Sequence, residues 1–143
     1  DSANKVIATN VEDGIAEIAA WKETTDTWKT AVTPQVPVQI ADPGTGGVIP
    51  VTASGNCSIT IGSDGAETNT LAAPTFVGQR LSISVTEAGT GTRKVTVASA
   101  INKTGNVSIT LAAAGDSIEL VAMKVGTGLA WRVVVNDGCT LGA

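Results

Sequence analysis

Acidic side chains are the residues in this sequence that could most readily supply acid–base chemistry. They form three close pairs: Glu12 with Asp13, Asp64 with Glu67, and Asp116 with Glu119. Two neighbouring carboxyl groups can divide the roles of acid and base between them, as in glycoside hydrolysis. Each pair, however, lies at the start of a predicted helix or beside a predicted turn, where acidic residues commonly bond to backbone groups. We therefore expect no catalytic carboxylate pair.

Other catalytic and metal-binding arrangements lack the residues that they require. The sequence has no histidine, which excludes Ser-His-Asp and Cys-His arrangements, histidine metal sites and the commonest general base. No segment has the alternating oxygen ligands of a calcium loop, and the glycine-rich run 44–47 lacks the lysine of a phosphate-binding loop. We expect a protein that is not an enzyme and that binds no metal or cofactor.

Cys57 and Cys139 are the only cysteines, too few for a structural zinc site with four ligands. Two interpretations of them stay open. Free cysteine is among the most buried residue types, so both can be small core residues. Alternatively, a disulfide between them would tie the C-terminal end of the chain to an early strand, which requires oxidising surroundings.

The charge and length of the chain limit its partners. Its 143 residues carry a net charge of −4, and its nine basic residues are scattered from Lys5 to Arg132. A basic stripe that could neutralise phosphates is missing, so we expect no nucleic-acid partner. No apolar run approaches the roughly 20 residues of a membrane-spanning helix, so we expect no membrane partner. The sequence begins at Asp1 without Met, which is compatible with a leader that has been removed.

The first 33 residues form an N-terminal arm with a helical pattern. Apolar residues follow one another at helical spacing at Val11, Ile15, Ile18, Trp21 and Trp28. We predict a helix over residues 11–22, followed by a fraying or extended stretch because Thr24, Thr25 and Thr27 favour helices weakly. Two of the three tryptophans lie in this arm, so we expect these five apolar residues to bind a partner. The alternative is that the arm packs back on its own β-domain.

Residues 34–143 have the pattern of an all-β domain. Prolines and glycines mark the change near Thr33, and turn signals then recur at short intervals. The predicted strands number about eight and span residues 36–40, 48–52, 57–61, 80–86, 94–98, 107–111, 117–125 and 129–136. This spacing is typical of a β-sandwich or a jelly-roll-like domain. Aromatic residues make up only 3% of the chain, so its core must be mainly aliphatic, and we expect an oligomer.

Three strand segments have features beyond simple alternation. Asn56-x-Ser-Ile-Thr-Ile61 and Asn106-x-Ser-Ile-Thr-Leu111 are near copies, which either record a duplicated β-unit or arose by convergence. The run from Val133 to Val135 is continuously apolar, as in a strand that is covered on both faces. That strand is predicted to lie either centrally in a sheet or at a subunit contact.

Two segments carry a resemblance to a known family. They are Leu71-x-x-Pro74-x-x-x-Gly78-Gln79-Arg80, which precedes an alternating strand, and the run from Ile109 to Val121 with Gly115-Asp116, which precedes the Trp131 strand. Together they resemble a β-domain of tailed-bacteriophage virion proteins, notably capsid decoration (cement) proteins and fibres. The resemblance implies a β-sandwich or jelly-roll homotrimer on the capsid exterior that clamps neighbouring major capsid protein subunits. It implies no catalytic residues.

The function that we expect is therefore that of a structural virion protein. In the first hypothesis the protein cements a phage capsid and the arm, residues 11–32, reaches onto the shell or an adjacent copy. The alternative is a fibre or adhesin module whose Gly/Thr loops bind a cell-surface glycan. A third hypothesis is the head of a secreted or pilus-like protein with Cys57 and Cys139 bonded.

Overall fold

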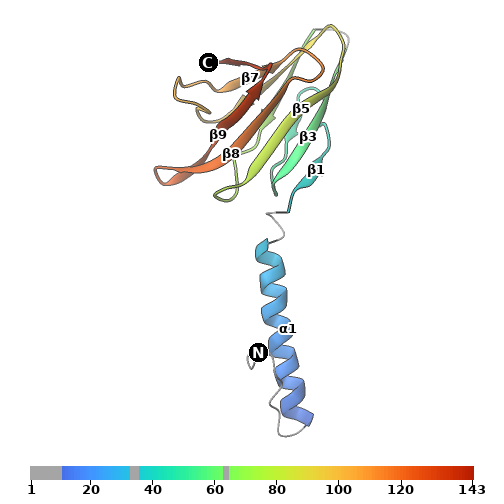
Figure 1. Cartoon of the computed structure of the whole chain (residues 1–143), viewed down its shortest axis with the longest axis vertical. Helices are drawn as coiled ribbons and strands as arrows, with labels where there is room; N and C mark the ends of the chain where they lie inside the picture. Colours follow the sequence, from blue (N-terminus) through green and yellow to red (C-terminus); the bar gives the residue numbers. More distant parts are fainter. Residues whose placement is uncertain (1–10, 33–35, 63–64) are drawn as a thin grey trace. The chain divides into compact units, whose positions relative to one another are not determined.

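The chain divides into two compact units. The computed structural model describes residues 11–32, 36–62 and 65–143, and its two units are Asp1–Pro34 and Gln35–Ala143. The described part of the first unit is a helix, and the second unit is built from strands (Figure 1).

Helix α1 spans Val11–Val32 and is ten residues longer than the sequence pattern indicated. The prediction that it would fray after Lys22 is wrong. The hydroxyls of Thr24 and Thr25 donate to the carbonyls of Ala20 and Trp21, at 3.1 and 2.9 Å, which satisfies these side chains inside a helix. Lys22 also lies 2.6 Å from Asp26 one turn later, and such i,i+4 pairs support a helix.

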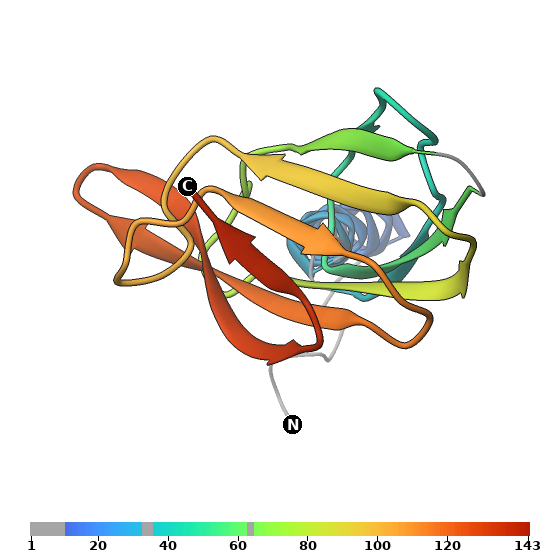
Figure 2. The ribbon, with the colours of Figure 1, turned by 90° about the horizontal axis from the view of Figure 1, so that it is seen from above.

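The second unit is a β-sandwich, which confirms the predicted all-β class. Its described residues form ten strands in two five-stranded sheets, and Figure 2 shows the strands in two layers. Sheet A has the order β1 (Val38–Ile40), β3 (Gly55–Ile61), β5 (Arg80–Ala88), β8 (Ser117–Val125) and β9 (Gly128–Asp137). Sheet B has the order β10 (Thr140–Gly142), β7 (Ser108–Leu111), β6 (Thr92–Val97), β4 (Ala66–Leu71) and β2 (Val48–Ile49).

The first six strands alternate between the two sheets. As a result β1, β3 and β5 pair in parallel in sheet A, and β2, β4 and β6 pair in parallel in sheet B. The last four strands pair antiparallel with their neighbours. Jelly rolls are antiparallel architectures. Of the two predicted alternatives, the β-sandwich therefore describes this fold.

The core lies between the sheets and is mainly aliphatic, as the composition indicated. Alternating residues of β3 and β5, such as Ile59 and Ile83, point inward and are fully buried, because successive side chains of a strand face opposite sides. Trp131 of β9 is 1% exposed, and its indole N–H donates to the Ala72 carbonyl at 2.9 Å. Each buried aliphatic side chain contributes about 1.5–3 kcal/mol, so the stability of this unit is spread over many residues.

Strand β9 does not lie centrally, contrary to one of the two expectations for the run from Val133 to Val135. It is the last strand of sheet A, and Val134 and Val135 are 48% and 49% exposed. The pairing register shifts between Glu119 and Leu120 of β8, which leaves Val134 as an extra residue. Such a bulge disrupts the edge of a sheet and limits its pairing with other strands.

The two near-copy segments occupy different sheets. Strand β3 pairs in parallel on both sides in sheet A, whereas β7 pairs antiparallel on both sides in sheet B. Equivalent halves of a duplicated unit would be expected to have equivalent neighbours. Convergence on a favourable strand sequence therefore accounts better for the likeness.

Candidate functional site

The predicted partner-binding residues lie on α1. The helix exposes Ile15, Ile18 and Trp21, at 64%, 56% and 62% of their surfaces. Val11 and Trp28 also belong to α1, but their side chains lie outside the described part of the structure. Exposed large apolar side chains at this spacing are typical of interaction surfaces, and the binding of a partner by these residues stays a prediction.

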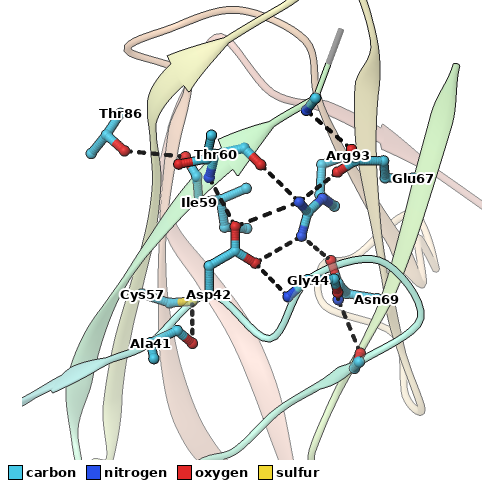
Figure 3. Close-up of polar contacts among 12 residues, drawn as sticks. Ala41, Asp42, Gly44, Cys57, Ile59, Thr60, Glu67, Asn69, Thr86 and Arg93 are labelled. Atoms are coloured by element: carbon cyan, nitrogen blue, oxygen red, sulfur yellow. Dashed lines mark hydrogen bonds and ion pairs between the residues drawn. The ribbon is translucent and has the colours of Figure 1, made fainter. Parts of the chain in front are cut away.

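A second group of functional side chains was not predicted from the sequence. Arg93 of β6 is 2% exposed and points into the sandwich (Figure 3). Its guanidinium donates to Asp42 Oδ1 at 2.9 Å, to Asn69 Oδ1 at 2.7 Å and to the Thr60 carbonyl at 2.8 Å. Its Nη2 also lies 2.5 Å from Glu67 Oε2 as an ion pair. We call these five residues the Arg93 cluster.

The acceptors of the Arg93 cluster also bind the backbone around them. Asp42 accepts the N–H groups of Gly44 and Thr60, both at 2.9 Å, and Glu67 accepts that of Gly62 at 3.0 Å. Burial raises the pKa of the Asp42 carboxyl, but the hydrogen bonds from Thr60, Gly44 and Arg93 outweigh this effect, so its pKa lies below the ordinary 3.8.

This geometry gives the Arg93 cluster a structural role. It joins the loop after β1 and the end of β3, on the side of sheet A, to β4 and β6 of sheet B. Asn69 adds two bonds from its amide N–H groups to the carbonyls of Gly44 and Gly47, at 2.6 and 3.0 Å. Because the charged groups bond to one another and to the backbone, the cluster fixes one end of the sandwich.

The signal for this cluster was present in the sequence. Glu67 and Arg93 are direct partners in the register between β4 and β6, and Asn69 follows Glu67 on the same inward face. In the sequence, Glu67 stands out only as one half of the carboxylate pair with Asp64. A strand in which the inward positions are polar, opposite a strand with an inward arginine, indicates a buried ion pair.

The other predicted carboxylates do not form a catalytic pair among the described residues. Asp64 lies outside the described residues, as do the side chains of Glu12 and Asp13. Asp116 accepts the N–H groups of Ala112 and Ala113, at 2.7 and 3.0 Å, and therefore stabilises a turn. Among the described residues, no cluster of histidine, cysteine or carboxylate side chains is suited to hold a metal ion.

The Gly78-Gln79-Arg80 segment also has a structural role. Gly78 has a φ of +81°, which favours glycine. Gln79 is fully buried and donates to the carbonyls of Val51 and Ala53 at 2.6 and 2.9 Å. Its side-chain oxygen accepts the N–H of Thr75 at 2.7 Å. The segment thus joins the loop before β3 to the start of β5.

The two cysteines are free and buried. Burial, with a smaller contribution from Asp42, raises the pKa of the Cys57 thiol to about 11. Burial also raises the pKa of Cys139 to about 11, together with Asp116 and Asp137. Protonated, buried thiols match the interpretation of both residues as small core side chains and not the alternative of a disulfide.

Comparisons with known proteins give no match. No protein-family model matches the chain, and no curated protein matches it. Within the described residues, no helix has the length and apolarity that crossing a membrane requires.

Proposed function

We propose that this protein is a structural virion protein that binds the outer surface of a phage capsid as a homotrimer and joins neighbouring major capsid protein subunits. The observation that carries the proposal is the combination of a β-sandwich with a separate helical unit that exposes large apolar residues. The buried polar side chains of the sandwich form hydrogen bonds with groups of the sandwich itself. In contrast, Ile15, Ile18 and Trp21 are exposed and therefore available to a partner.

The resemblance to virion β-domains supports the same role. The Gly78-Gln79-Arg80 turn precedes β5 and the Asp116 turn precedes β8, so both segments that carry the resemblance lie at the starts of strands of sheet A. A protein that binds only the assembled shell stabilises that shell by mass action. Three copies that bind adjacent capsid subunits would increase this effect, because linked contacts dissociate less readily than single ones.

Co-sedimentation with capsids tests the proposal. Expanded capsids assembled from the major capsid protein of the same genome would be mixed with the full chain or with residues 35–143. We expect the full chain to sediment with capsids in a saturable manner, and the folded truncated chain to stay in solution. A Lys103→Ala variant of the full chain, altered in an exposed loop, should bind like the unaltered protein. Failure of the full chain to bind would contradict the proposal.

A glycan-binding fibre or adhesin module is the second candidate. The outer face of sheet B is rich in exposed hydroxyl side chains, including Thr68, Thr70, Thr96 and Thr140, which could hydrogen-bond to sugars. Stacking on an exposed aromatic ring would strengthen such a site, but Trp131, the only tryptophan of the β-domain, is buried. Saturable binding on a glycan array without affinity for capsids would favour this candidate over the first.

A further inference from the structure

The outer face of sheet A changes from polar to apolar between β5 and β8. Successive side chains of a strand face opposite sides, so the residues between the buried ones point outward. On β3 and β5 these outward positions carry small polar side chains, namely Asn56, Ser58, Ser82 and Ser84. On β8 three successive outward positions are instead apolar, namely Val121, Met123 and Val125. Met123 and Val125 are 51% and 45% exposed, which is unusual for the solvent side of a sheet.

This apolar stripe continues onto a hairpin that extends past β5. The register pairs the first residue of β5, Arg80, with Val121, whereas β8 and β9 stay paired as far as Val125 and Gly128. Figure 2 shows the hairpin projecting from the sandwich. On β9, Val135 lies opposite the outward residue Glu119 and is 49% exposed. We call Val121, Met123, Val125 and Val135 the β8–β9 face.

Basic side chains lie beside the β8–β9 face. Arg80 and Arg132 are the register partners of Val121 on its two sides, and Lys124 is exposed near the end of β8. None of these three cations forms an ion pair with another described residue. Glu119 supplies one carboxylate to this part of the sheet. The surface around the face is therefore positively charged, although the chain as a whole carries −4.

The charge of this surface limits what would cover it. Two copies that packed their β8–β9 faces together would bring like charges against one another, which is unfavourable. Proteins that bind at a lipid surface combine basic residues with exposed aromatic ones, but Phe76 is half-buried and Trp131 is buried. Apolar side chains with cations beside them instead complement a protein surface that combines apolar groups with carboxylates.

We propose that the β8–β9 face binds a partner protein whose surface presents apolar side chains beside carboxylates. The inference rests on the proposed function, in which this partner is the major capsid protein, and it adds a contact from the sandwich to the contact from α1. A stable interface has roughly 20–30 residues on each side. The β8–β9 face is much smaller, so it strengthens binding by the arm and does not replace it. A chain that contacts the shell through both units would join neighbouring capsid subunits directly.

Co-sedimentation of full-chain variants with capsids tests the apolar part of the face. We expect Val125→Asp to raise the protein concentration for half-maximal binding about tenfold, because it places a charge in the contact. Val48→Asp is the matched control: Val48 is 55% exposed and lies on β2 of sheet B, so this variant should bind like the unaltered protein. Equal binding of the two variants would overturn the proposal and leave the proposed function standing. Failure of the unaltered chain to bind would overturn both.

A charge reversal tests the chemistry of the partner. We expect Lys124→Glu to weaken capsid binding about tenfold at low ionic strength, and the difference from the unaltered protein to shrink as salt is added. Lys94→Glu is the control, because Lys94 is exposed on the outer face of sheet B and the change in net charge is the same. Equal effects of the two substitutions would overturn the assignment of an acidic partner to this face.

Two measurements on the full chain distinguish the other occupants. We expect no flotation with vesicles of phosphatidylcholine and phosphatidylserine; flotation that Lys124→Glu abolishes would overturn the proposal in favour of a lipid surface. We also expect Val125→Asp to have the same mass as the unaltered protein in analytical ultracentrifugation. A lower mass would overturn the proposal, because the face would then hold copies of the chain together.

Discussion

Arg93 carries a positive charge into the interior of the sandwich, where Asp42, Glu67 and Asn69 surround its guanidinium. The net contribution of a buried ion pair to stability is often small, but removing one partner leaves the other charge buried without compensation. We predict that Arg93→Met lowers the free energy of unfolding by about 3–5 kcal/mol. Urea denaturation of residues 35–143, in which Trp131 is the only tryptophan, followed by tryptophan fluorescence would measure this loss.

Lys94→Met is the control for Arg93→Met. Lys94 is the next residue of β6 and lies exposed on the outer face of sheet B, so the same kind of substitution there should change stability by no more than about 0.5 kcal/mol. Equal effects of the two substitutions would show that Arg93 does not stabilise the sandwich through its ion pairs.

At the scale of elements, eight of the ten described strands could be predicted from the sequence, and β4 and β10 could not. Most inward positions of β3 and β5 are aliphatic, so the period of two in these strands was clear. Strand β4 was missed because two of its inward residues, Glu67 and Asn69, are polar and serve Arg93. Strand β10, Thr140–Gly142, was missed because its short segment has one apolar side chain, that of Leu141, and ends in glycine, so it shows no alternation. The missed strand β4 and the missed site therefore have one cause, which is the pairing of buried polar residues over a long sequence separation.

The turn between β9 and β10 provides a prediction at the same scale. Gly138 has a φ of +84°, and a Cβ atom there would overlap the Asp116 carboxylate. That carboxylate holds the backbone of Ala112 and Ala113 in place. We predict that Gly138→Ala destabilises the protein by about 1–3 kcal/mol, since it adds backbone strain and displaces Asp116. Thermal unfolding followed by circular dichroism would measure the change.

Gly128→Ala is the comparison for Gly138→Ala. Gly128 begins β9 without a positive φ, and a Cβ atom added there would have no neighbour within 4 Å. Its substitution should shift stability by less than about 0.5 kcal/mol. A neutral Gly138→Ala variant would mean that the turn can rearrange around the new methyl group.

At the scale of the whole molecule, the hydrophobic core formed by the described residues lies in the second unit, from Ile40 to Cys139. The Arg93 cluster and the Gln79 bonds lie there as well. We therefore predict that residues 35–143 fold alone, with the same midpoint of urea denaturation as the full chain, and that the helical circular dichroism signal of α1 is lost.

This truncation also decides between the two expectations for the arm. A helix that packed back on its own sandwich would bury Ile18 and Trp21 within one chain, so its removal would lower the midpoint at every protein concentration. A helix that associates with other copies would leave the midpoint of the β-domain unchanged, while its own melting would depend on protein concentration, as for any associating species. Measuring the full chain at two concentrations separates these cases, because only intermolecular burial responds to dilution.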